Sequence, residues 1–153
     1  MHFDTIKKLK DRFTDQIEVH EKRANRIYVN VRDKEKALDV VKFLFVECSL
    51  RFSIASGVDR RDGIEILYHM SDDKAGAKIS VRTLAEKPHP CLPSATGFLP
   101  GAEWIEREIH ELLGVDFIGH PNLKRLLLPD DWPEGEHPFR KKSFDSEKEG
   151  LEK

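Results

Sequence analysis

The residues of this chain with the greatest chemical potential lie between positions 106 and 137. Glu106 and His110 are four residues apart, so one face of a helix could present both to a metal ion. His120 or His137 could act as a third ligand, although the spacing lacks the His-Glu-x-x-His pattern of zinc hydrolases. These residues therefore support one hypothesis for function, a small metal-dependent hydrolase that uses Glu106, His110 and His120 or His137.

Other catalytic chemistries have weaker support in the sequence. Ser94, Ser143 and Cys91 lie outside any nucleophile motif such as Gly-x-Ser-x-Gly, and no glycine loop of the phosphate-binding type is present. Cys48 and Cys91 are the two cysteines of the chain, which is too few for the four ligands of a typical iron–sulfur cluster or structural zinc site. Cys48 ends an apolar run, and we expect it to be a buried, reduced thiol.

Length and composition predict one globular domain with a densely charged surface, since the chain has 153 residues and 35% of them are charged. The net charge of −2 provides no basic surface for nucleic acid, and aromatic RNA-binding strand motifs are missing. No apolar segment approaches the roughly 18 residues that span a membrane. The N-terminus is too charged for a secretory signal, so we expect a cytosolic chain that reaches membranes only through partners.

The first half of the chain alternates helical and strand patterns. Residues 3–13 have the spacing of a short amphipathic helix, and alternating apolar residues at 27–31 predict a half-buried strand. Asp33 then stands where the N-cap of a second helix would be, and this helix should end near Cys48.

Three further strands are predicted at 51–58, 63–70 and 77–84, and the short turns between them favour an antiparallel meander. A third helix should span 102–113 and stop at Gly114. This order predicts an α+β fold, with a mixed or antiparallel sheet and helices packed on one face.

The chain should divide into an α+β domain at 1–113 and an extended, proline-rich tail at 114–153 that docks on partner subunits. Prolines recur along this tail and oppose regular structure. Extended backbone has no internal hydrogen bonds and must find partners elsewhere, so such a tail is easier to explain if it lies along another subunit.

On a helical wheel for residues 102–113 the apolar residues fall within one arc, and we expect this arc to face the sheet. On this wheel Glu106 and Glu108 fall at the borders of the apolar arc, half-buried, whereas Arg107, Glu103 and Glu111 project away from it. Arg107 is four residues from each of the last two carboxylates and can pair with either of them. A plain solvated face with border salt bridges is therefore an alternative to a functional surface.

Half-buried carboxylates on this helix need partners. The basic residues Lys124, Arg125 and Arg140 are candidates, and they would either fold the tail back against the helix or leave room for another protein's groups. Trp104 and Trp132 flank the charged segment and could be ordinary core residues or anchors of an interface.

A long pattern of charged residues and leucines connects the helix to the tail: Glu106-Arg107-Glu108-x-x-Glu111-Leu112-Leu113, then His120, then Lys124-x-Leu126-Leu127, with flanking stretches at 93–104 and 137–141. This pattern resembles the signature of the 30 kDa subunit of respiratory complex I, the NADH–quinone oxidoreductase. The likeness covers roughly residues 90–144, whereas the N-terminal part agrees only in the order of its elements.

The resemblance implies an α+β subunit with no catalytic centre, metal or cofactor of its own, part of an electron-transport complex. Members of this family lie in the hydrophilic arm against the large catalytic subunit and the small iron–sulfur subunit. Those partners would carry the iron–sulfur clusters and, in hydrogenase-type complexes, a [NiFe] centre. The chain would then be peripheral, on the cytoplasmic face of the cell membrane.

Residues 126–135 are more similar to the branch found in membrane-bound [NiFe] hydrogenases and formate hydrogenlyase than to the respiratory branch. The resemblance therefore predicts an assembly subunit of an ion-translocating, hydrogenase-type complex, with a respiratory NADH–quinone oxidoreductase or a sulfur-reducing complex as alternatives. Glu111 and Lys142 stand where many members have Asp, and the second departure puts one tail contact in question.

The polar residues of the pattern and of the adjoining tail, together with Trp132, are the expected interface with the large subunit. They are Glu106, Arg107, Glu108, Glu111, His120, Lys124, Arg125, Trp132, His137 and Arg140.

Overall fold

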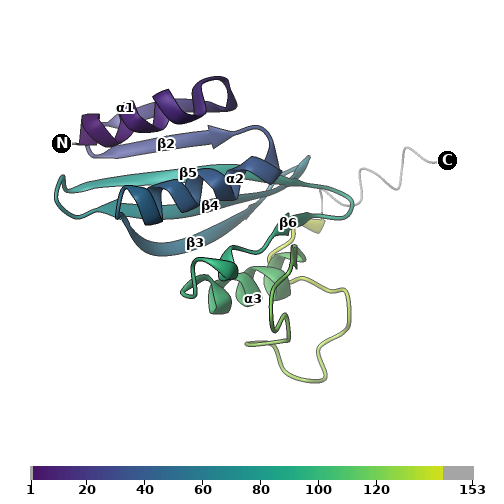
Figure 1. Ribbon diagram of the computed structural model, residues 1–153. Coiled ribbons are helices and arrows are strands. Elements are labelled where there is room, and N and C mark those ends of the chain that lie inside the picture. The colour runs from purple at the N-terminus through teal and green to yellow at the C-terminus, as the bar shows by residue number, and fades with distance from the viewer. Residues whose placement is uncertain (1, 143–153) are drawn as a thin grey trace.

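The computed structural model describes residues 2–142 of the chain (Figure 1). Its elements in chain order are α1 (His2–Phe13), the 3-10 turn η1 (Thr14–Gln16), β1 (Ile17–Arg23), β2 (Arg26–Val31), α2 (Lys34–Lys42), the π-helical turn η2 (Phe43–Glu47), β3 (Arg51–Asp59), β4 (Gly63–Asp72), β5 (Ala77–Glu86), β6 (Cys91–Pro93), the 3-10 turn η3 (Ala95–Gly97), α3 (Ala102–Leu113) and β7 (Asp116–Ile118).

Five strands form one mixed sheet in the order β1-β2-β5-β4-β3. The predicted meander of β3, β4 and β5 is antiparallel throughout, and β2 pairs with β5 in parallel after the chain has crossed over through α2. Strand β1 is an edge strand that the sequence pattern did not predict. Its residues beyond Val19 are exposed, and a strand with so little buried surface has no clear alternation of apolar and polar residues.

Helices α1, α2 and α3 cover the same face of this sheet, which confirms the predicted α+β arrangement. Ile27, Ile66 and Ile79, from β2, β4 and β5, are fully buried on that face. Helices α1 and α2 lie over the part of the sheet formed by β2, β5 and β4, whereas α3 lies beside β3 (Figure 1). Gly57 of β3 permits the close approach of α3, because a Cβ atom there would clash with the Leu113 side chain.

Local signals in the sequence set the ends of α2 and α3 as predicted. The Asp33 carboxylate accepts a hydrogen bond of 3.0 Å from the backbone N–H of Glu35 at the start of α2. Gly114 ends α3 with a φ of 72°, in the left-handed region that favours glycine, and its N–H donates to the His110 carbonyl. Cys48, after η2, is half-buried rather than fully buried, and its burial raises the pKa of the thiol.

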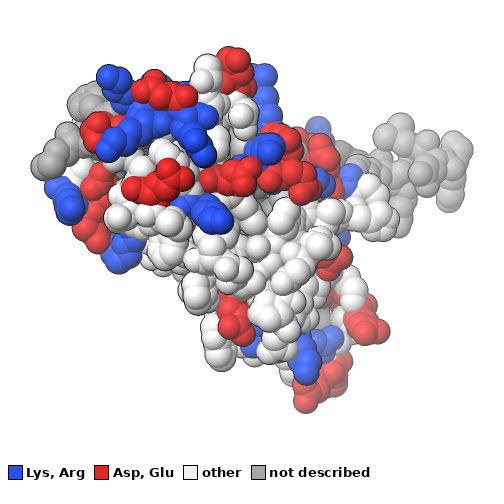
Figure 2. Space-filling model, viewed as in Figure 1, with Lys and Arg blue, Asp and Glu red and all other residues white. Residues whose placement is uncertain are grey.

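Charged side chains are unevenly distributed over the surface. In the view of Figure 2, Lys, Arg, Asp and Glu gather over α1 and α2 and again on the tail, whereas the surface between these regions is largely uncharged. That uncharged band coincides with η3, α3 and the approach to β6 in Figure 1.

Candidate functional site

Helix α3 lies at the centre of the predicted site, and two of its carboxylates are more buried than the helical wheel indicated. Glu106 has no exposed surface. Its carboxylate accepts hydrogen bonds from the Ser94 hydroxyl at 2.6 Å and from the backbone N–H of Ala95 at 2.8 Å. Burial raises the pKa of Glu106, and these two donors oppose that rise only in part. The prediction that Glu106 is half-buried was wrong, because η3 packs over the side of α3 that carries it.

Glu111 holds the tail against α3. Its carboxylate accepts three backbone hydrogen bonds, from Leu126 at 3.1 Å, Leu127 at 2.8 Å and Leu128 at 2.9 Å. Burial by itself would raise the pKa of Glu111, but the three N–H donors and the charge of Arg125 outweigh it, so the pKa is lowered. The prediction that Glu111 projects away from the packed side of the helix was wrong, because the tail covers that side and leaves it 6% exposed.

Arg107 supplies donors that complement the acceptors of Glu111. Its Nε donates to the Lys124 carbonyl at 2.9 Å and its Nη2 to the Arg125 carbonyl at 2.8 Å. The guanidinium also lies 5.4 Å from the centre of the Trp104 ring, in cation–π range. Within residues 2–142 it forms no ion pair with Glu103 or Glu111, so the predicted pairing is wrong.

Arg125 and Trp132 shape the next turn of the tail. Arg125 donates to the carbonyls of Pro129, Asp130 and Trp132 at 2.8, 3.1 and 2.9 Å, so one guanidinium holds a whole turn together. The Trp132 indole N–H donates to the Glu136 carbonyl at 3.0 Å. Lys124 is exposed, and only its backbone takes part in these contacts.

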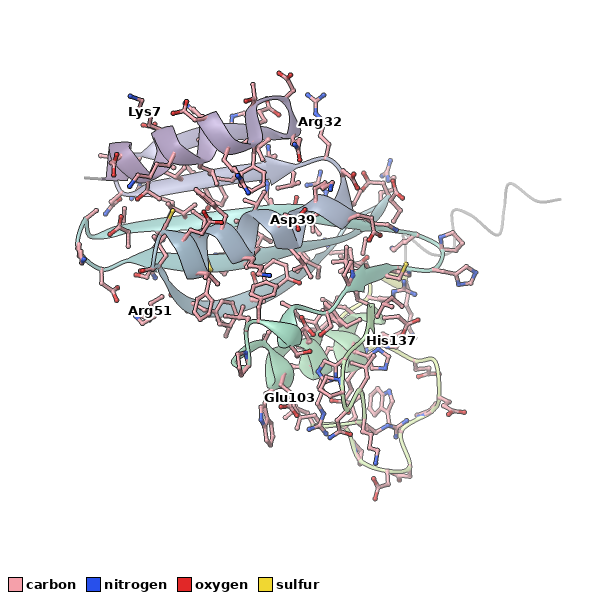
Figure 3. All side chains as sticks on the ribbon, viewed as in Figure 1. Lys7, Arg32, Asp39, Arg51, Glu103 and His137 are labelled. Carbon is pink, nitrogen blue, oxygen red and sulfur yellow. The ribbon has the colours of Figure 1, made fainter. Side chains whose placement is uncertain are left out.

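The histidines contact backbone groups of different segments. His137 Nδ1 lies 2.9 Å from the Glu111 carbonyl, and Figure 3 shows His137 beside α3. His120 accepts from the backbone N–H of Asn122 through Nδ1, so its Nε2 is the donor to the Glu103 carbonyl at 3.0 Å. His110 Nδ1 lies 2.9 Å from the Val115 carbonyl. The part of the chain that the structure describes contains no group of three or more potential metal ligands, so it does not assemble the set proposed for a hydrolase.

The tail also caps the open end of α3. The last carbonyls of a helix have no partner within it, and here Glu111 and Leu112 receive theirs from His137 and from the backbone N–H of Phe139, at 2.9 and 3.0 Å. For Glu111 the tail folds back against the helix, which is the first of the two alternatives, whereas Glu106 is bound by Ser94 and Ala95 and Glu108 has no partner among the described residues. The tail supplies backbone N–H groups rather than the predicted Lys124, Arg125 and Arg140 side chains.

A second anchor joins the end of the tail to the sheet, and the sequence analysis missed it. Asp59 at the end of β3 is buried with Lys87 as an ion pair of 2.9 Å, and it also accepts from the backbone N–H of Lys141 at 2.6 Å. Arg140 contributes two buried nitrogens, Nε and Nη2, that have no acceptor among the described residues. Ser143 and the tail beyond it lie outside the described residues.

Residues 29–149 match the family described as respiratory-chain NADH dehydrogenase, 30 Kd subunit. The chain belongs to this family. The resemblance carried by the charged helix and the tail is thereby confirmed. No helix within residues 2–142 combines the length and the apolar character needed to cross a bilayer.

Relatives in this family come from several kinds of complex. The chain is 39% identical over 113 residues to a subunit of the NADH-quinone oxidoreductase of Roseiflexus sp. strain RS-1, a match that covers 70% of this chain and 64% of the relative. It is 37% identical over 111 residues to formate hydrogenlyase subunit 5 of Escherichia coli K12, which covers 70% of this chain and 20% of that protein. The chain thus spans less than two thirds of either relative.

A solved structure shares the fold over nearly the whole chain. It is that of a membrane-bound sulfane sulfur reductase, an archaeal respiratory membrane complex, with a TM-score of 0.77. The match covers 96% of this chain and 90% of the other at 22% sequence identity, which supports the fold alone.

Proposed function

We propose that this chain is a non-catalytic assembly subunit of a membrane-bound, complex I-like oxidoreductase. It docks on the large catalytic subunit and the small iron–sulfur subunit, which carry the redox cofactors. The observation that carries this proposal is the tail itself, a stretch of irregular backbone that Glu111 and Arg107 hold in one conformation through five hydrogen bonds. A surface fixed in advance loses less conformational entropy when it binds a neighbour.

The site residues have two kinds of role in this proposal. Glu106, Arg107, Glu111, Arg125 and His137 give the surface its shape through contacts inside the chain. The exposed Lys124 and the half-buried Glu108 are available to touch the partner directly. The chain would lie on the cytoplasmic face of the membrane and be attached only through its partners.

Among the complexes of this family we favour the hydrogenase type. Two relatives support it, formate hydrogenlyase subunit 5 and hydrogenase-4 component G of Escherichia coli K12, at 37% and 36% identity. The Roseiflexus relative at 39% identity supports a second candidate, the 30 kDa subunit of an NADH–quinone oxidoreductase.

Purification of the chain with its neighbours tests the proposal. The tagged chain is extracted from membranes in mild detergent, and the proteins that accompany it are identified by mass spectrometry. A [NiFe] large subunit supports the hydrogenase type, whereas a quinone-reducing or sulfur-reducing large subunit supports the other branches. Recovery of the chain without any oxidoreductase subunit would contradict the proposal.

Metal analysis of the isolated chain addresses the hydrolase hypothesis. Since Glu106 and the three histidines are engaged with other groups, we expect no stoichiometric zinc or iron after purification. One bound equivalent of either metal, lost on substitution of His110, would favour the hydrolase instead.

A further inference from the structure

A groove of about 460 Å³ lies between the edge strand β3, helix α3 and the tail. Its lining comes from β3, including Phe52 and Ile54, from α3 and the residue before it, including Trp104 and Glu108, and from the tail, including Leu127. Apart from Ser53 and Glu108 the side chains of this lining are apolar. The groove therefore lies where the tail, which Glu111 and Arg107 hold against α3, meets the edge strand β3.

The apolar side chains of this groove are unusually exposed. Ile54, Trp104 and Leu127 are 52%, 64% and 61% exposed, and they are three of the seven large hydrophobic residues exposed within residues 4–142, where side-chain burial is described. Single exposed leucines are normal on protein surfaces, but apolar residues gathered in one concave place are typical of a binding site. Trp is also among the residues that most often anchor interfaces.

The structure holds Leu127 outward rather than allowing it to find cover. The backbone N–H groups of Leu126, Leu127 and Leu128 are all bound to the Glu111 carboxylate, and the carbonyls of Lys124 and Arg125 are bound to Arg107. These hydrogen bonds of the tail are made by its backbone groups, and most of the Leu127 side chain is left exposed. The arrangement is that of a surface prepared for a partner.

Glu108 indicates the charge of the group that the partner places in the groove. Its side chain is half-buried in the apolar groove, and among the described residues it makes no hydrogen bond or ion pair. The neighbouring cation, Arg107, is engaged with two carbonyls and the Trp104 ring. A carboxylate that loses its remaining water when the groove is filled needs a positive charge from the occupant.

We propose that this groove binds an apolar segment of the large subunit that carries one Lys or Arg, and that this basic group pairs with Glu108. Apolar residues on either side of the basic group would cover Ile54, Trp104 and Leu127. The inference rests on the proposed function, because it assumes that the chain is assembled with a large subunit. It adds the place of the contact and the charge of the partner.

Charge reversal in the groove tests the pairing. With the whole complex expressed and the chain tagged, Glu108→Lys should lower recovery of the large subunit roughly tenfold or more, because a buried like charge replaces a pair. Asp39→Lys on the exposed face of α2 is the matched control, with the same change in charge, and it should leave recovery unchanged. Leu127→Ala, which keeps the backbone contacts, should lower recovery by a smaller factor.

A photo-crosslinking amino acid at position 104 identifies the occupant. We expect one crosslinked peptide from the large subunit with a Lys or Arg flanked by apolar residues, and reversal of that basic residue to Glu should restore recovery with Glu108→Lys. Crosslinks to lipid, to a second copy of this chain or to a peptide without a basic residue would overturn the inference. Normal recovery with both groove variants would also overturn it while leaving the proposed function intact, whereas failure of the unaltered chain to recover any oxidoreductase subunit would reject the proposed function itself.

Discussion

The two ends of the helical layer are stabilised in different ways. Over β2, β5 and β4, helices α1 and α2 bury closely packed aliphatic side chains such as Leu9, Val40 and Ile79, all with no exposed surface. Around α3, buried carboxylates bind backbone N–H groups of the short turn η3 and of the irregular tail. Aliphatic packing is non-directional and tolerates small shifts, whereas hydrogen bonds fix position within a few tenths of an ångström. The first region therefore supplies stability, and the second supplies a surface of defined shape.

The largest effect should follow from a charge placed in the first region. Ile79→Asp puts a carboxylate with no partner into the middle of the sheet and should cost roughly 4 kcal/mol or more, enough to unfold the domain. Circular dichroism and urea denaturation measure the loss. Lys78→Asp, one residue away on the exposed side, should remain folded, and equal damage from both would contradict the contrast between the faces.

Glu111→Ala should damage the second region while sparing the first. It removes the acceptor of three backbone N–H groups and should weaken docking of the tail by roughly 3 kcal/mol, since each such bond to a charged group contributes about 1.5–3 kcal/mol and the three are not additive. Hydrogen exchange should accelerate at Leu126–Leu128 and not in β4 or β5. Global unfolding instead would mean that the two regions are not separable. Glu103→Ala, on the same helix, is the control.

The two carboxylates of α3 should respond to pH in opposite directions. The pKa of Glu111 is lowered, so its contribution is present above the unfolded value near 4.5 and is lost as the pH falls through the folded value. The pKa of Glu106 is raised, so its contribution is present below 4.5 and is lost as the pH rises through the folded value. Carbon-13 NMR titration of the two carboxyl groups checks both directions. Parallel titration of the two groups would show that burial dominates both sites.

The smallest effect should come from an ion pair that belongs to neither region. Arg51 and Asp73 are 2.8 Å apart at the edge of the sheet, but their side chains are 60% and 57% exposed. Water and salt screen such pairs, so Arg51→Ala should leave the thermal midpoint within error of the unaltered protein. A clear fall in the thermal midpoint would show that this edge is also stabilised by directional contacts.

The sequence predicted the first region better than the second for a physical reason. The strands around Ile66 and Ile79 and the cap at Asp33 are encoded locally, in alternation and in one side chain that binds nearby backbone. The burial of Glu106 and Glu111 depends instead on η3 and the tail, which cover α3 on sides away from the sheet. A helical wheel assumes one packed side, so it could not place these carboxylates.

The signature of the family was visible in the sequence although the roles of its residues were not. Arg107 and Glu111 were expected to face a partner or each other, yet both bind the tail of their own chain. The three N–H groups that Glu111 binds belong to an ordinary run of leucines, and main-chain donors leave no mark in a sequence pattern. The need of half-buried carboxylates for partners was the hint that the tail could return to the helix.

The tail begins after β7 and returns to α3 at Phe139, whose backbone N–H donates to the Leu112 carbonyl in the last turn of that helix. When both ends of a loop are fixed, a longer loop costs only extra closure entropy, about 0.6 kcal/mol for each doubling of the loop length. An insertion at the exposed Glu134 and Gly135 should therefore cost little, whereas one within residues 120–132 would break the contacts of Arg107, Glu111 and Arg125.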